Sequence, residues 1–343
     1  MKEITECTEE YEKAWSEYVE TSPFTTIAHH IGWKQVIRSS LGHKPRYVLA
    51  IEGSRIKGIL PLFVLKTWWR SSYIVSVPWI DYGGICADDP ETEELLLSKA
   101  CRITEAEKAE FMELRSAKTS NLNLEHRRDK VTFLLRLDKN PDLIWKGFDS
   151  KLRNQIRKSQ KYGLSVEFGG VEKLGSFYRV FSHNMRDLGT PVWGIELFES
   201  ILKQFVHMSQ LVLVKKEGTV ISGGLILSFK DRLYVPSASS YRSSLRYYPN
   251  HALYWEVIKK ACEQGYQYFD FGRSTWHSNT FNFKKQWVPV PTQLSWQYYL
   301  NRRKDLPSLN PSNPKFRILI SLWKRLPLAI ANWLGPRIVR NFP

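Results

Sequence analysis

Apolar and polar positions repeat along the chain with two different periods, which predicts a mixture of helices and strands. Apolar residues recur at helical spacing over residues 3–20, 26–40 and 91–107. Apolar runs bounded by turn residues predict strands at 46–52, 56–65, 72–77, 111–115 and 131–137. Helices and a hairpin in this order indicate one mixed α/β module.

The pattern starts again near residue 139. Helices are predicted at 143–160, 171–188, 195–206 and 250–264, and strands at 164–168, 210–215, 220–229, 233–239, 268–271 and 294–299. Each half contains a hairpin that turns at a glycine, Gly53 or Gly218, followed by strand, helix and strand. We interpret this as a structural duplication with domains at 1–138 and 139–300, followed by a linker and a basic amphipathic segment at 301–343.

Composition fits two globular domains. The chain has 343 residues, with 13 Trp, 16 Tyr and 17 Phe, which favours large cores and aromatic clefts over disorder. The four cysteines form no CxxC pair, so we expect neither a zinc site nor a disulfide framework. We see no secretory signal and no apolar run of the roughly 20 residues that a membrane span needs. A cytoplasmic enzyme is therefore predicted.

Positive charge is concentrated in one part of the chain. The net charge is +16; residues 1–200 carry 29 Lys and Arg against 28 Asp and Glu, whereas residues 201–343 carry 21 against 6. This asymmetry favours a polyanionic partner such as RNA, CoA, a phosphorylated substrate or anionic lipid. The alternative is that the basic surface only aids solubility.

Several common catalytic motifs are absent. We find no P-loop, GxGxxG, HExxH or GxSxG, and no carboxylate cluster that suggests a metal. His29-His30 lacks the Asp of an HHxxxD motif, because position 34 is Lys. The remaining chemistry holds two substrates together and stabilises developing charge without a metal.

The segment after the strand at 268–271 is the strongest candidate site. Asp270 and Arg273 follow an apolar strand, where open α/β sheets place ligand crevices, and Arg273 suits a phosphate or carboxylate. Lys284, between Phe283 and Trp287, suits stabilisation of an oxyanion or binding of phosphate. The alternatives are a structural Asp270–Arg273 ion pair and a surface cation at position 284.

Two further features suggest binding. The predicted helix at 146–161 stacks Arg153 on Arg157 with one acid nearby, which favours a bound anion, although a solvated face is an equal alternative. Gly223-Gly224 within a strand indicates a bulge or a close ligand approach, or else close helix packing. Tyr82, in the turn Asp81–Gly84, is expected to line the cleft.

Three segments together resemble the FemAB-like transferases, in particular the subgroup associated with bacterial exopolysaccharide and exosortase loci. They are 268–274 with 281–287, 151–163, and 184–191, and the resemblance spans about residues 25–300. It implies an α/β (α+β) fold of tandem GNAT-like domains with mixed, mainly antiparallel sheets. It also implies acyl or aminoacyl transfer onto an amine of a cell-envelope or exopolysaccharide acceptor, a class that includes lipid- and sugar-linked amines.

The resemblance assigns the donor and the site. The donor is aminoacyl-tRNA or acyl-CoA, with no permanently bound cofactor and no metal. The Phe283-Lys284 pair is implicated in catalysis or tRNA contact, and the catalytic candidates are Lys284, Asp270 and Arg273. Gly223 and Gly224 are donor-binding candidates; the substrate-binding candidates are Tyr82, Lys151, Arg153, Arg157, Arg186, Ser274, Trp276, Phe283 and Trp287. The sequence departs from the family in the turn at 276–280 and in Val288, which predicts a different acceptor pocket.

Two other functions compete with this one. The first is CoA-dependent N-acetylation of a small molecule, and the second is a non-catalytic basic protein that binds membrane or RNA. Convergence of Asp270, Arg273 and Lys284 in a cleft would favour an enzyme.

The segment at 315–343 is basic and amphipathic. It has six Lys and Arg and no acid, together with Trp323 and Trp333. It suits the cytoplasmic face of an anionic inner membrane, which predicts a peripheral membrane protein. The alternative is that it packs as helices on the second domain.

Overall fold

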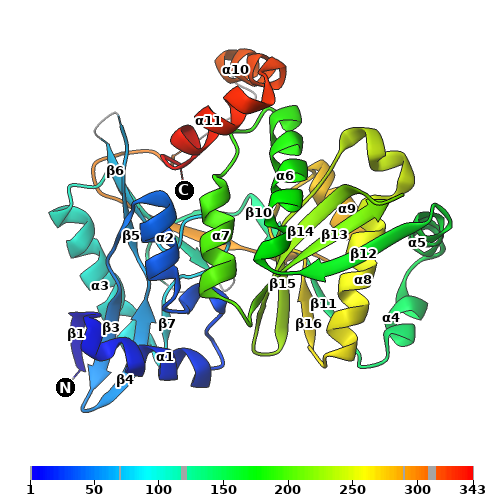
Figure 1. The fold of residues 1–343 in the computed structure, drawn as a ribbon. Helices are drawn as coiled ribbons and strands as arrows, with labels where there is room; N and C mark the ends of the chain where they lie inside the picture. The colour runs from blue at the N-terminus through cyan, green and yellow to red at the C-terminus, as the bar shows by residue number, and fades with distance from the viewer. Residues whose placement is uncertain (1, 69–70, 117–121, 289, 308–313, 343) are drawn as a thin grey trace. The chain divides into compact units, whose positions relative to one another are not determined.

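The structure is a computed structural model that describes residues 2–68, 71–116, 122–288, 290–307 and 314–342. The chain divides into two compact units. Unit 1 comprises Met1–Val131, Gln293–Ser308 and Asn341–Pro343, and unit 2 comprises Thr132–Thr292 and Leu309–Arg340. Figure 1 labels their helices and strands.

Unit 1 contains two sheets. The first has the order β1 (Lys2–Glu6), β3 (Val48–Glu52), β4 (Arg55–Leu60) and β7 (Cys86–Ala87). The second has the order β2 (Lys44–Pro45), β5 (Phe63–Lys66), β6 (Ser72–Val75), β8 (Phe111–Ser116), β19 (Ser295–Leu300) and β9 (Glu125–Arg127). Its helices are η1 (Glu9–Tyr11), α1 (Glu12–Thr21), η2 (Ile27–His29), α2 (Trp33–Leu41) and α3 (Pro90–Ala106).

Helix α3 completes the core of unit 1. Its apolar face buries Leu96 and Ala100 in a cluster with Val48 and Met112. The helix approaches β4 closely at Gly58, where an added Cβ would lie 2.8 Å from a Thr92 methyl carbon. Glycine is required at that point because any side chain would displace the helix.

Unit 2 is built on one six-stranded sheet. Its order is β11 (Leu134–Arg136), β16 (Tyr268–Asp270), β15 (Arg232–Ser240), β14 (Thr219–Phe229), β13 (Ser209–Lys216) and β12 (Leu164–Gly169). Its helices are α4 (Pro141–Gly147), α5 (Ser150–Lys161), η3 (Val171–Lys173), α6 (Leu174–Leu188), α7 (Ile195–Gln204), η4 (Arg242–Tyr247), α8 (Pro249–Glu263), α9 (Asn279–Lys285), α10 (Pro314–Arg325) and α11 (Leu328–Val339). The short strands β10 (Lys130–Thr132), β17 (Ser274–Thr275) and β18 (Thr292–Gln293) complete the set.

The two glycines in β14 show how helices cover this sheet. An added Cβ on Gly223 would lie 3.2 Å from the Phe177 ring of α6, and one on Gly224 would lie 3.5 Å from Leu253 of α8. Successive strand residues face opposite sides of a sheet. Helices α6 and α8 therefore pack on opposite faces, as Figure 1 also shows.

The fold class is confirmed: both units are mixed α/β, and their sheets are mainly antiparallel. Each unit has a parallel pair joined through a helix, β6–β8 through α3 and β15–β16 through α8. Each also has a hairpin whose turn contains a left-handed glycine, Gly53 (φ 60°) or Gly218 (φ 78°). These shared features match the predicted duplication.

Several element predictions were wrong. The strand at 295–300 does not close the second half: β19 pairs with β8 and β9 in unit 1. The first helix begins at Glu12, because Lys2–Glu6 pairs with β3 instead. The helix expected over 143–160 is two helices, since Asp149 caps a new one by accepting a hydrogen bond from the Leu152 amide at 2.6 Å.

Candidate functional site

The carboxyl end of β16 forms a tight, buried turn. Asp270 is fully buried, and its Oδ1 accepts hydrogen bonds from the Thr132 hydroxyl at 2.7 Å and from the Gly272 amide at 2.9 Å. Its Oδ2 lies 3.8 Å from Arg232 Nη1. Gly272 has φ 72°, a conformation that glycine adopts without strain. Asp270 therefore holds the turn, and we assign it a positioning role rather than contact with substrate.

Lys284 closes this turn from α9. Its side chain is only 7% exposed, and its ammonium donates to the carbonyls of Gly272 at 2.8 Å and Arg273 at 2.9 Å. The position is thus a buried cation and not the surface cation that the sequence left open. Buried ammonium groups are rare unless they are paired or functional.

Aromatic rings surround the base of this cation. Trp287 is buried, and its ring centroid lies 5.9 Å from Phe271 and 6.2 Å from Phe283. The Nε1 of Trp287 and the hydroxyl of Ser274 are buried without hydrogen-bond partners in the described structure. Buried polar atoms of this kind are uncommon and often mark functional sites.

His251 joins the same cluster, and the sequence reasoning missed it. Its ring is 5.2 Å from Phe283 and 6.2 Å from Trp287, and neither ring nitrogen has a partner in the described structure. Burial lowers the pKa of His251 from 6.5 to about 4. The imidazole is therefore neutral near pH 7. His251 lies in no recognisable motif, so the sequence gives little indication of its role. Its ring neighbours Phe283 and Trp287 lie about thirty residues further along the chain.

The parallel strands β15 and β16 pair over a short distance. The register runs from Arg232–Tyr268 to Tyr234–Asp270, whereas β15 continues to Ser240. The end of β15 is polar: the Ser240 hydroxyl donates to Asn250 Oδ1 at 2.6 Å, at the start of α8. A crevice beyond the carboxyl ends of parallel strands is where open α/β sheets bind ligands.

The amino end of α8 is positioned to favour an anion. This 15-residue helix has no side-chain cap, and its N-cap residue Tyr248 has a left-handed conformation (φ 59°). Lys158 of α5 places its Nζ 5.7 Å from the centre of the Tyr248 ring. The first residue, Pro249, has no amide hydrogen, and the amides of His251 and Ala252 donate to the Tyr248 carbonyl at 3.0 and 3.2 Å. The helix dipole and the nearby cation, rather than free amide groups, attract negative charge.

The remaining cations of α5 lie along one exposed helix. Lys151 and Arg157 are exposed and Arg153 is half-buried. The Arg157 guanidinium lies 5.4 Å from the Trp145 ring. A chain of ring contacts then connects α5 to the Lys284 region. Trp145 contacts Trp255 at 5.0 Å between centroids, Trp255 contacts Phe148 at 5.9 Å, and Phe148 contacts Trp287 at 5.4 Å.

Other predicted site residues fall elsewhere. Arg186 donates to Asp187 and to the Leu326 carbonyl, so it holds the segment between α10 and α11. Gly223 and Gly224 pair regularly with β13 and β15; the register shifts lie on either side of them, between Val220 and Ser222 against β13 and between Leu225 and Leu227 against β15. They have the close helix packing that was the alternative, so their part in donor binding stays a prediction.

Tyr82 lies in unit 1 and is buried. Its loop is held by Arg115, whose Nη1 donates to the Ile80 carbonyl at 2.7 Å. The Gly84 amide donates back to the Arg115 carbonyl at 2.7 Å. In unit 2, Arg273 is exposed in the turn that Lys284 contacts. The Trp276 ring lies 5.1 Å from the Phe281 ring of α9, between centroids.

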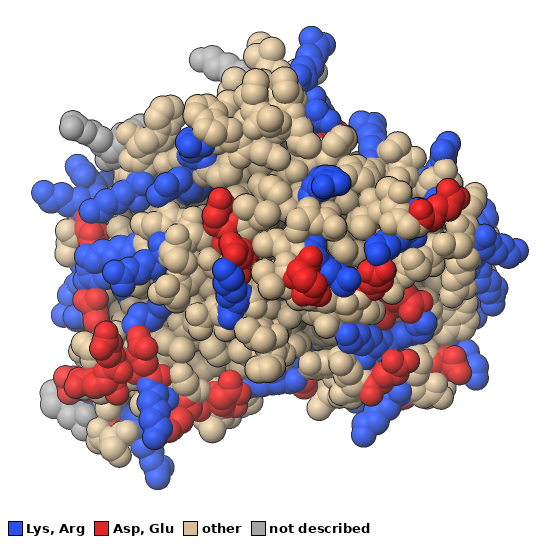
Figure 2. All heavy atoms as spheres, in the orientation of Figure 1, with Lys and Arg blue, Asp and Glu red and all other residues tan. Residues whose placement is uncertain are grey.

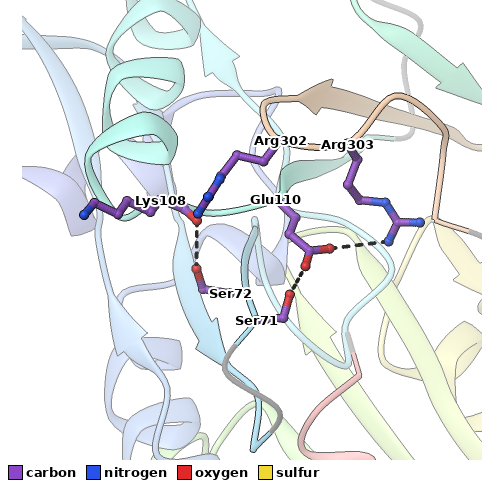
Figure 3. A pocket seen from close by; sticks show the side chains of 6 residues that line it. All are labelled: Ser71, Ser72, Lys108, Glu110, Arg302 and Arg303. Carbon is purple, nitrogen blue, oxygen red and sulfur yellow. Dashed lines mark hydrogen bonds and ion pairs between the residues drawn. The ribbon is translucent and has the colours of Figure 1, made fainter.

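A polar hollow of about 370 Å³ lies in unit 1 (Figure 3). Its lining residues are Ser71, Ser72, Lys108, Glu110, Arg302 and Arg303. Glu110 accepts from Ser71 and pairs with Arg303 at 3.6 Å. Three cations and one acid line the hollow, so it has a net positive charge, and no predicted site residue lies among them.

The described residues contain neither a metal-site cluster nor a membrane-spanning helix. No cluster of three or more His, Cys, Asp or Glu side chains with the arrangement of a metal site occurs there. No described helix combines the length and the apolar composition of a membrane span.

Comparison with known families decides the class of unit 2. Residues 146–285 match the family described as "Acetyltransferase (GNAT) domain". Over these residues the chain is similar to that domain. The match contains α5, the five strands from β12 to β16, α8 and Lys284, and it supports the assignment of an acyltransferase.

Solved structures extend the likeness of fold to nearly the whole chain. FemX is 18% identical with a TM-score of 0.66, and the alignment covers 88% of this chain and 98% of FemX. The C-terminal domain of a proposed lysylphosphatidylglycerol synthetase from Agrobacterium fabrum is 11% identical with a TM-score of 0.58, covering 86% and 92%. A tandem GNAT protein from the clavulanic acid biosynthesis pathway is 10% identical with a TM-score of 0.52, covering 89% and 100%. The tandem GNAT-like fold is thus confirmed. No curated protein sequence matches the chain significantly.

Proposed function

We propose that the chain transfers an acyl or aminoacyl group from a tRNA or CoA carrier onto an amine of a cell-envelope or exopolysaccharide-related acceptor. The observation that carries the proposal is the buried Lys284 ammonium at the carboxyl end of the β15–β16 pair, within a GNAT domain. The acceptor amine attacks the acyl carbonyl directly.

The chemistry asks for charge stabilisation. A C–N bond forms as the amine adds, and the carbonyl oxygen becomes an oxyanion in the tetrahedral intermediate. The ester C–O bond or the thioester C–S bond then breaks. The released oxygen or sulfur takes the amine proton and becomes a hydroxyl or a thiol. A buried cation is strongly effective against an oxyanion because little water screens it. Lys284 supplies that charge.

The carrier is anionic, and unit 2 is suited to it. The dipole at the amino end of α8 and the Lys158 ammonium attract phosphate at the end of β15. Arg153 and Arg157 of α5 add charge along the same helix. Part of the excess positive charge of residues 201–343 also lies in this unit.

An aminoacyl donor and a lipid-bearing acceptor are favoured by the neighbours. The fold is similar to that of FemX, and the name of the second structure, lysylphosphatidylglycerol synthetase, denotes the synthesis of an aminoacylated phospholipid. We place the protein at the cytoplasmic face of the membrane, where such acceptors are displayed.

A second candidate is CoA-dependent N-acetylation of a small molecule. It is favoured by the similarity of residues 146–285 to an acetyltransferase domain and by the tandem GNAT neighbour, whose structure is described as being without AcCoA. The site residues proposed above serve either donor.

Binding of the two carriers to the full chain tests the proposal. Native mass spectrometry and titration calorimetry with aminoacylated tRNA and with acetyl-CoA are the appropriate measurements. We expect aminoacyl-tRNA to bind with an affinity that falls as salt rises. Binding of acetyl-CoA alone would establish the second candidate, and failure of both carriers to bind would refute both.

A further inference from the structure

We propose that the outer face of the α10–α11 pair is a docking surface for an anionic lipid bilayer. The helices span Pro314–Arg325 and Leu328–Val339, and both belong to unit 2. This inference deepens the proposed function and rests on it only for the identity of the acceptor; the surface itself is argued from unit 2 alone.

The inner face of the pair is fixed to unit 2 through small residues. An added Cβ on Gly335 would lie 2.8 Å from the Val192 amide nitrogen, and one on Gly189 would lie 2.5 Å from the Ile320 side chain. Ala331 is also buried. Both helices contact α6, and Figure 1 shows them beside its end. The inner face therefore packs on unit 2, as the alternative prediction for this segment stated.

The outer face of the pair carries large, exposed apolar side chains. Ile318, Leu319 and Leu322 of α10 are 63%, 60% and 57% exposed, and Ile330 and Trp333 of α11 are 43% and 59% exposed. In a helix whose only partner is its own domain, large apolar residues point inward and small or polar residues point outward. In α11 the small residues Ala331 and Gly335 are buried while the large residues Ile330 and Trp333 are exposed, which indicates a second apolar partner.

Charge identifies that partner. Lys324, Arg325, Arg337 and Arg340 are exposed on the pair, and the segment from 314 to 343 contains no acid. Arg337 lies over the Trp333 ring at 4.4 Å, so a cation sits at the margin of the apolar surface. In Figure 2 the region of α10 and α11 is mostly tan with blue at its edge.

A bilayer fits both properties. Amphipathic helices with Trp and Leu on one side and Lys and Arg at the boundary lie in the headgroup region of anionic membranes. A protein partner for a surface with only positive charge would need a matching acidic rim. The side chains of residues 314–317, including Lys315 and Arg317 of the predicted cation set, lie outside the described ones.

Vesicle co-sedimentation of the full chain tests the surface. The probes are phosphatidylcholine vesicles with and without phosphatidylglycerol, and the variant is L322E/W333E. The matched control is L143E/V206E, which adds the same charge at two other exposed apolar positions of unit 2, 51% and 63% exposed. We expect the wild type and the control to bind anionic vesicles, and the variant to bind on the order of tenfold less or weaker still. Circular dichroism confirms that all three are folded.

Three results would overturn the proposal. The first is equal binding of the variant and the control. The second is binding that is indifferent to phosphatidylglycerol. The third is a dimer in light scattering that the variant dissociates, without vesicle binding by the wild type, which would make a second copy the occupant. Vesicle binding is measured without donor or acceptor, so its result does not depend on whether the proposed reaction is correct. Turnover of a soluble substrate by L322E/W333E likewise does not depend on whether the membrane surface is correct.

Discussion

Replacing Lys284 with methionine separates the catalytic role of this cation from its structural one. Methionine keeps a flexible apolar side chain of similar length and removes the charge. In the folded chain it would leave the carbonyls of Gly272 and Arg273 without the ammonium that contacts them at 2.8 and 2.9 Å. The nearby rings of Phe283 and Trp287 can still pack on the new side chain.

The two effects differ in size. Hydrogen bonds from a charged donor contribute about 1.5–3 kcal/mol each. Relief of the cost of burying a charge, several kcal/mol in proteins, offsets most of that loss. We therefore expect the free energy of unfolding to change by about 2 kcal/mol or less. The loss of one oxyanion donor, in contrast, lowers kcat by on the order of 10²–10³.

The assay is single-turnover transfer from the carrier that binds, with thermal unfolding of each variant in parallel. K285M is the control, because Lys285 is the exposed neighbour on the same helix and loses the same charge. A transition-state role lowers kcat and leaves KM near that of the wild type, whereas a loosened turn changes both. Wild-type kcat in folded K284M, or an equal loss in K285M, would refute the reasoning.

Three other predictions follow from unit 2. D270N should lower the free energy of unfolding by about 1–3 kcal/mol, because the neutral oxygen accepts more weakly from Thr132 and Gly272 and the new NH2 group faces the Arg232 guanidinium; an unchanged denaturation midpoint contradicts this. R153E/R157E should weaken carrier binding and reduce the salt slope by about one per lost phosphate contact, unlike the control K203E/K259E; equal titration curves would exclude α5. Since burial lowers the pKa of His251 to about 4, the unfolded chain binds more protons between pH 6.5 and 4, and stability should fall by up to about 3 kcal/mol as pH falls through that range. H251F should remove this acid sensitivity in pH-dependent melting, and an identical pH profile would argue against it.

The elements that local pattern specifies were predicted well. Helix α3 was expected at 91–107 and spans Pro90–Ala106, and α8 was expected at 250–264 and spans Pro249–Glu263. Both have a continuous apolar face and a proline at the start, so periodicity and end signals agree. The Lys284 segment was also accessible, because β16, its turn and α9 are contiguous in sequence and need no long-range pairing.

The parts that depend on distant partners were not accessible. The alternation in 295–300 predicts a strand, but its pairing with β8, from Ser295–Ser116 to Leu300–Phe111, joins segments far apart in the chain. His251 is neutral and buried only because Tyr248, Phe283 and Trp287 close around it. The split of α4 from α5 was different, since the Asp149 cap was visible in the sequence and was overlooked.

The duplication also explains why the motifs occur in the second half only. In unit 1 the matching parallel pair, β6–β8, ends at Val75–Glu113, and Arg115 follows further along β8. There the Arg115 guanidinium, 1% exposed, bonds to Glu113 at 2.7 Å and to the carbonyls of Val77 and Ile80, and lies 4.5 Å from the Trp296 ring. This buried ion pair, packed against an aromatic ring, lies beyond the end of the parallel pair in unit 1, where unit 2 has the Lys284 turn. We therefore expect unit 1 to serve the acceptor or the fold rather than a second transfer reaction.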